Sequence, residues 1–173
     1  RHREGGRSAA PPCAMDEETE AAIDKARASG SVRAVLEELR REPPPEAVRL
    51  VCDALFRLVQ HDARAARELV AEGGVEALSA TMGRHAQAAE VQQHAAAVLW
   101  RVAQLGGPHT ARAVATRGGF DALEAVLRSF PEGSTAFEVA LLATEVLEDH
   151  GLVDDDGADE PRYQGKAYAR IMV

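Results

Sequence analysis

The acidic run DDDGADE at 154–160 is a candidate group of metal ligands. Closely spaced carboxylates suit Ca²⁺, but the glycine stands at the wrong position for an EF-hand loop and no matching helices flank it. The histidines are scattered, with no pair at metal-ligand spacing. The chain has neither a glycine-rich phosphate loop nor a nucleophile elbow. The sequence therefore predicts no metal site, no cofactor and no enzyme.

Two arginines, Arg57 and Arg101, stand 44 positions apart in the similar segments LFRLV and LWRVA. Arginine is favoured at protein interfaces, so contact with a partner is one interpretation of this recurrence. A solvated surface is the alternative, and the sequence gives the two equal weight. The neighbouring Phe56 and Trp100 share the same shift, and two large rings at one repeat position predict core between repeats rather than a binding site.

The elements that position these residues follow from an internal repeat. The segment GGVEAL at 73–78 aligns with GGFDAL at 118–123 after a shift of 45 positions, and with GSVRAV at 30–35 after a shift of 43. Helical armadillo or HEAT units have repeats of ~40–47 residues. The sequence therefore predicts a repeat domain over 15–150, with units at about 16–60, 61–105 and 108–150.

Each unit is expected to hold three helices, because apolar residues recur at helical spacing between Gly and Pro breaks. The first unit has a helix ending at Gly30, a helix capped by Ser31, a turn at the triple proline 43–45 and a helix over 46–60. The second has helices over 62–71, 75–84 and 90–104, and the third has helices starting at Pro108, at Phe120 and at Phe137. These nine segments predict an all-α fold.

Composition agrees with this class and excludes others. The 173 residues are 46% hydrophobic and only 4% aromatic, which favours an Ala-, Val- and Leu-rich helical core. The formal charge of −8 opposes binding to nucleic acid. No apolar run reaches the ~18 residues that cross a bilayer, so no membrane insertion is expected. Cys13 and Cys52 stand too far apart, in different contexts, to indicate a disulfide framework or a zinc site.

The two ends differ from the repeat domain. Residues 1–14 have no apolar periodicity, and two interpretations stay open: a tail before a true start at Met15, or the remnant of a transit peptide. The first places the protein in the cytoplasm and the second in an organelle. Residues 151–173 form an acidic linker and an extended basic tail, in which Tyr163, Tyr168 and Ile171 are expected to contact a neighbouring subunit. The terminal Ile171-Met172-Val173 also resembles a PDZ ligand, provided that the native chain ends there.

A helix ending in Gly-Gly, then VEAL, then VQQHAAAVLWRVA resembles the armadillo-repeat family. The resemblance is good in the central unit, fair in the third and weaker in the first. It implies a right-handed α-solenoid of about three three-helix units, whose third helices line a concave groove for partner proteins. Importin-like members carry Trp and Asn on that helix, whereas this chain has Ala97 and Arg101 in the centre and Asp53 and Arg57 in the first unit. This departure opposes a nuclear-import receptor.

The expected groove changes from mixed and basic to acidic along its length. Its candidate residues are Arg49, Asp53, Arg57, His94, Arg101, Glu138, Glu145 and Asp149. We expect a non-catalytic scaffold or accessory subunit of a larger protein assembly. The alternative is an adaptor or carrier that captures an extended peptide in the groove.

The last helix carries more apolar positions than one inward face requires, so part of it should be covered. Either another protein or the tail from Leu152 to Val173 is the candidate cover. We favour a partner protein, because the acidic start of the tail would meet Glu145, Glu148 and Asp149 and be repelled.

Overall fold

The computed structural model describes residues 15–151, and within that range it contains helices and connecting turns but no strand. The all-α prediction is therefore confirmed for the described residues. The helices begin and end within a few residues of the predicted positions. They are α1 (Glu17–Ala28), α2 (Val32–Arg40), α3 (Pro45–Val59), α4 (Ala63–Ala71), α5 (Gly74–Arg84), α6 (Ala89–Gly106), α7 (Pro108–Val114), α8 (Phe120–Ser129) and α9 (Thr135–Gly151). The segment η1 (Ala115–Gly119) joins α7 to α8 through a kink at Arg117 and Gly118, whose φ and ψ are not helical.

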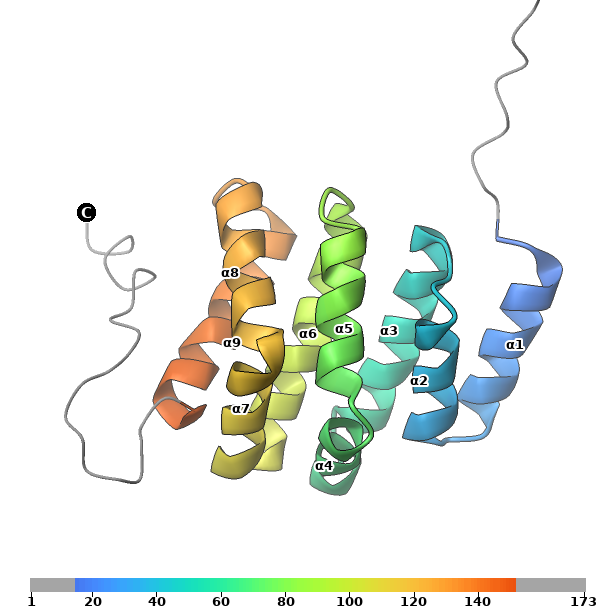
Figure 1. Cartoon of the computed structure of the whole chain (residues 1–173), viewed down its shortest axis with the longest axis horizontal. Coiled ribbons are helices and arrows are strands. Elements are labelled where there is room, and N and C mark those ends of the chain that lie inside the picture. Colours follow the sequence, from blue (N-terminus) through green and yellow to red (C-terminus); the bar gives the residue numbers. More distant parts are fainter. Residues whose placement is uncertain (1–14, 152–173) are drawn as a thin grey trace, which may run out of the picture.

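The helices follow one another along the long axis of the molecule, from α1 at one end to α9 at the other (Figure 1). In that view α2, α5 and α8 form a front layer, and α3, α6 and α9 lie behind it. Helix α3 packs on α6 and α6 on α9, while α2 contacts α5 and α5 contacts α8. The second and third helices of each segment therefore contact the corresponding helices of the next segment.

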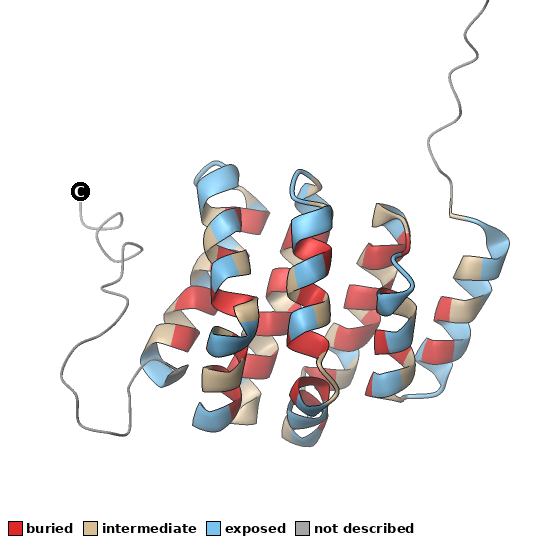
Figure 2. Ribbon diagram, viewed as in Figure 1, coloured by how far each residue is buried: buried red, intermediate tan, exposed pale blue. Residues whose placement is uncertain are grey.

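The burial pattern repeats with the shifts found in the sequence. Positions buried on α3 are buried again on α6 after a shift of 44, and on α9 after a further shift of 45. Such triplets are Ala47, Val91 and Ala136; Val48, Gln92 and Phe137; Val51, Ala95 and Ala140; Ala54, Val98 and Ala143; and Leu55, Leu99 and Thr144. In Figure 2 the buried residues, in red, lie mainly where the helices face one another. The core is thus built from the same positions three times.

The Gly-Gly pairs allow each short helix to turn sharply into the next one. The first glycine of Gly73-Gly74 and of Gly118-Gly119 has a left-handed φ, 73° and 91° respectively, which L side chains rarely adopt. The second glycine leaves room for the preceding helix. A Cβ there would lie 2.6 Å from the Leu69 Cδ2 atom in the first pair and 2.6 Å from the Val114 carbonyl oxygen in the second. Both glycines of each pair are therefore required by geometry.

Local capping explains two other helix starts. The Ser31 hydroxyl accepts a hydrogen bond of 3.3 Å from the Ala34 amide, so this side chain caps α2 as predicted. The last residue of the triple proline, Pro45, belongs to the first turn of α3. Proline is accommodated there because no backbone amide hydrogen is needed at that position. Helix α3 accordingly begins one residue before the predicted Glu46.

Ion pairs link neighbouring segments on the side of the short helices. Arg33 of α2 lies 3.9 Å from Glu72, and Glu76 of α5 lies 3.6 Å from Arg117. Positions 33 and 76 correspond after a shift of 43, and positions 72 and 117 after a shift of 45. The same link therefore occurs twice, with the signs of its charges reversed.

Candidate protein-binding surface

The residues nominated for a groove lie on the three long helices α3, α6 and α9. Adjacent members of this set of helices are in contact, so the nominated residues occupy neighbouring helices. Arg57, Glu138 and Asp149 are exposed, whereas Arg49, Asp53, His94, Arg101 and Glu145 are half-buried. Several of these side chains already have partners within the protein.

Two of the arginines on α3 are already paired. The Arg57 Nε atom lies 3.0 Å from an Asp53 carboxylate oxygen on the same helix. The Arg49 Nε atom lies 3.7 Å from the Glu90 carboxylate of α6. Exposed pairs of this kind contribute little stability, but they do neutralise the charge that a ligand would meet. The surface of α3 is therefore not a free basic patch.

Arg101 joins α6 to the end of α3. Its Nη2 atom donates a hydrogen bond of 2.9 Å to the carbonyl oxygen of Gln60, the residue that caps the C-terminus of α3. Nη1 donates to Gln104, and the guanidinium carbon lies 5.5 Å from the centroid of the Trp100 ring. A cation at a helix C-terminus satisfies an unpaired carbonyl and stabilises the helix dipole. Arg101 therefore has a structural role between two segments.

The prediction that Phe56 and Trp100 point into the core is wrong in part. Both side chains are half-buried and pack against the core from one side only. The position that corresponds to Trp100 on α9 holds Glu145, which is also half-buried. A repeat position that accepts a carboxylate lies at the margin of the core, where water can reach part of each side chain.

One face of α9 has no neighbouring helix among the described residues. It carries Glu138, Leu142, Glu145 and Asp149, which recur at helical spacing and which we name the α9 stripe. Leu142 is 46% exposed, and the structure shows no other large hydrophobic side chain this exposed within 15–151. An exposed leucine set among carboxylates is a candidate contact for a partner.

The repeat shows what covers the same face elsewhere. On α3 the positions that correspond to the α9 stripe, after the combined shift of 89, include Arg49 and Gln60. That face of α3, which also includes Asp53 and Phe56, is half-buried, and α6 reaches it through the Arg49–Glu90 ion pair and the Arg101–Gln60 hydrogen bond. The α9 stripe is therefore the equivalent of a face that is partly covered further back in the chain.

This end of the molecule is acidic. Helix α9 contains no lysine or arginine. Partial burial raises the pKa of Glu148, and the neighbouring carboxylates of Asp149, Glu145 and Glu124 raise it further. The carboxylates thus repel one another in the isolated protein, and a basic partner would relieve that repulsion.

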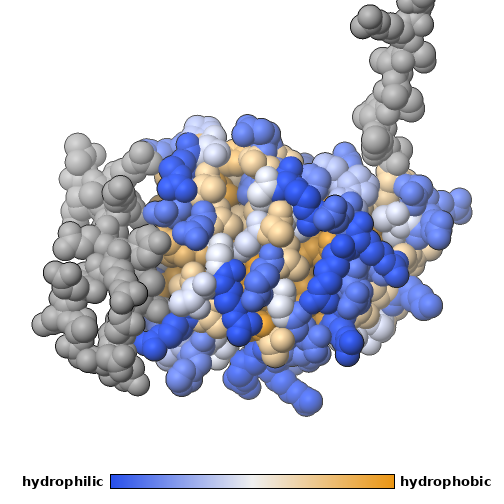
Figure 3. All heavy atoms as spheres, in the orientation of Figure 1, coloured by the Kyte–Doolittle hydropathy of each residue, from blue (hydrophilic) through white to orange (hydrophobic). Residues whose placement is uncertain are grey.

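A pocket of about 280 Å³ lies between α5 and α8, and the sequence analysis did not predict it. Met82, Ala122 and Ala125 contribute apolar surface, and Ser79 and Asp121 contribute polar groups. In Figure 3 apolar atoms lie between hydrophilic ones in this area of the surface. The signal that could have found it is Gly83, which stands where the other units carry an arginine.

The described residues contain no group of three His, Cys, Asp or Glu side chains that could hold a metal ion. Within 15–151 no helix is both long and apolar enough to span a bilayer. The predictions for 1–14, for the acidic run at 154–160 and for Tyr163, Tyr168 and Ile171 lie outside the described residues.

No family model matches this chain, and neither a curated protein nor a solved structure is significantly similar to it. The armadillo resemblance therefore rests on the residues and motifs of the sequence and stays a prediction.

Proposed function

We propose that this chain is a non-catalytic protein-binding module, an accessory subunit or scaffold of a larger assembly. Its fold would be a right-handed armadillo-type α-solenoid of three units. The recurrence of buried positions at shifts of 43 to 45 supports this reading, as do the contacts between corresponding helices. A stack of repeated units offers extended surfaces for partners rather than a pocket where reactive groups converge.

The observation that carries the proposal is the α9 stripe. It repeats a face that α6 partly covers on α3, yet the structure shows no such cover for it within 15–151. Exposure of Leu142 between Glu138 and Glu145 is consistent with a contact that a partner completes. The acidic surroundings favour a partner with basic side chains around an apolar one.

The alternative, capture of an extended peptide through Arg57 and Arg101, has less support. Arg57 is paired with Asp53, and Arg101 donates to the end of α3. An acidic peptide would have to displace these partners before it could bind. The two functions therefore depend on different residues, which makes them separable by mutation.

The test is affinity purification of the tagged full chain from cells, in the parent, Leu142→Arg and Arg57→Glu forms. We expect Leu142→Arg to lose the co-purifying subunits and Arg57→Glu to retain them. Both residues are largely exposed, so the melting temperature should stay close to that of the parent in each case. Loss of the partner in Arg57→Glu alone would support peptide capture instead. A complex that tolerates both changes would contradict both functions.

A further inference from the structure

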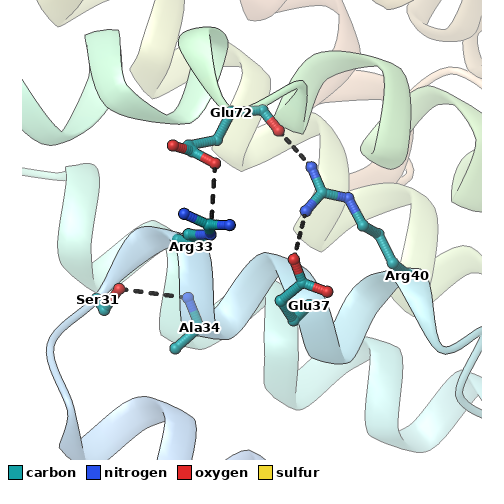
Figure 4. A network of polar contacts seen from close by, with 6 residues as sticks. All are labelled: Ser31, Arg33, Ala34, Glu37, Arg40 and Glu72. Atoms are coloured by element: carbon teal, nitrogen blue, oxygen red, sulfur yellow. Dashed lines mark hydrogen bonds and ion pairs between the residues drawn. The ribbon is translucent and has the colours of Figure 1, made fainter.

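An arginine lies at the junction between α2 and α5. Arg40 projects from α2, donates to the carbonyl oxygen of Glu72, which stands just before α5, and lies 3.1 Å from the Glu37 carboxylate (Figure 4). Its side chain stays partly exposed, whereas Leu36, one turn earlier on the same helix, is fully buried. This junction therefore has both an aliphatic side chain and a guanidinium.

The junction between α5 and α8 lacks both side chains. After the shift of 43, Ser79 stands in place of Leu36 and Gly83 in place of Arg40. A further shift of 45 leads to Arg128, which pairs with Glu124 at 3.2 Å. Only the central unit therefore lacks the arginine, and the pocket of about 280 Å³ lies where its side chain is missing.

The polar groups of the pocket suit a cationic donor. The Ser79 hydroxyl oxygen is buried and has no hydrogen-bond partner among the described residues. Asp121 lines the same pocket, is exposed, and makes no ion pair with any residue within 15–151. The Ser79 hydroxyl and the Asp121 carboxylate can both accept hydrogen bonds, and a guanidinium group carries five donors and no acceptor. Met82, Ala122 and Ala125 provide apolar surface for the methylene groups of the same side chain.

We propose that the pocket between α5 and α8 binds an arginine side chain presented by a partner polypeptide. The guanidinium donates to Asp121 and Ser79, and the aliphatic part of the side chain packs on Met82 and Ala125. The arginine takes the place that Arg40 occupies at the preceding junction. This inference rests on the proposed function in that the ligand is a polypeptide, but it uses a surface separate from the α9 stripe.

The test uses the full chain labelled with ¹⁵N and titrated with N-acetyl-L-arginine amide, with N-acetyl-L-norleucine amide as the matched uncharged probe. We expect the amide signals of Gly83, Gly118 and Ala122 to shift. A single side chain should bind with a dissociation constant on the order of millimolar. The norleucine probe should bind at least about fivefold more weakly, because it lacks the charged donors. Asp121→Asn should reduce this preference for arginine.

Gly83 provides the decisive pair of variants. A Cβ at this position has no neighbour within 4 Å, so Gly83→Ala is sterically allowed and the first side-chain atom of Gly83→Arg meets no obstacle. We expect Gly83→Ala to bind the arginine probe like the parent. Gly83→Arg should fill the pocket with its own side chain, as Arg40 does, and lose binding. Melting temperatures of both variants establish that they are folded.

Four outcomes would overturn the inference. They are equal binding of the two probes, no response to either probe, unchanged binding in Gly83→Arg, and signal shifts confined to α9. Because the proposed function is tested at Leu142 and not at this pocket, failure here would leave that function standing.

Discussion

Replacing Gln92 should reveal how strongly one buried amide holds α5 to α6. Gln92 is only 2% exposed, and its Nε2 atom donates hydrogen bonds of 2.8 Å to the carbonyl oxygens of both Met82 and His85. Met82 lies in the last turn of α5, where a helix carbonyl has no partner in its own helix, and His85 is the C-cap residue, whose carbonyl oxygen also accepts from the Ala88 amide. The corresponding residues Val48 and Phe137 are apolar, so this link exists in the central unit alone.

The variant Gln92→Met keeps the length of the side chain and removes both donors. Two net hydrogen bonds contribute about 1 kcal/mol each, and the desolvated Met82 carbonyl adds to the loss, so the free energy of unfolding should fall by about 2–3 kcal/mol. That corresponds to a melting temperature lower by roughly 5–10 °C for a domain of this size. Urea unfolding followed by far-UV circular dichroism measures the change.

Gln93→Met is the matched control, because Gln93 is half-buried on the same helix and has no hydrogen-bond partner within 15–151. We expect its free energy of unfolding to stay within about 0.5 kcal/mol of the parent. If Gln92→Met were as stable as Gln93→Met, the two carbonyls would not depend on the amide and the reasoning would be refuted.

Three further predictions concern single side chains. Arg101→Ala should lower the free energy of unfolding, measured with urea, by about 1–2 kcal/mol, because the carbonyl at the end of α3 loses its hydrogen-bond donor. Arg57→Ala is the control and should change the free energy of unfolding by less than about 0.5 kcal/mol. Equal effects of the two changes would contradict the structural role of Arg101. Burial raises the pKa of the Cys52 thiol to about 12, above its ordinary value of 9.0. The stability that the protonated thiol contributes is therefore fully present below pH 9 and is lost as the pH rises towards 12. In a Cys13→Ser chain at pH 8, a thiol reagent should modify Cys52 only when the protein unfolds. Rapid modification of the folded chain would contradict this burial. The pKa of Glu148 is also raised, so Glu148→Gln should stabilise the chain at pH 7 by about 0.3 kcal/mol. In thermal unfolding scans this gain should vanish as the pH falls below 4.5, the ordinary pKa of the carboxyl group. A gain that persists in acid would contradict this explanation.

The sequence predicted the helices because their signals are local. Gly73 and Gly118 mark left-handed positions, Ser31 marks a helix start, and the apolar periodicity between them defines the buried faces. The same periodicity placed Phe56 and Trp100 on an inward face. It could not distinguish the middle of that face from its margin, because the distinction depends on how closely the neighbouring helix approaches.

The contacts between units were not predictable from periodicity. Arg101 meets Gln60 across 41 positions, and whether their atoms are in reach depends on the offset between α3 and α6. The pocket beside Gly83 depends in the same way on the distance between α5 and α8. Alignment of the three units places Arg40, Gly83 and Arg128 at the same repeat position. This shows that the central unit lacks an arginine there, but it does not show that a pocket remains between α5 and α8.

The reversed ion pairs on the short helices favour the native order of the units. Arg33 faces Glu72 at the first junction, and Glu76 faces Arg117 at the second. If the central unit were deleted in register, Arg33 would face Arg117, and two like charges would meet where the native chain has a pair. Each junction therefore matches its own neighbour and opposes the next one along the chain. The charges thus favour the native order of the units over an order in which one unit is skipped, by the small free energy of an exposed ion pair.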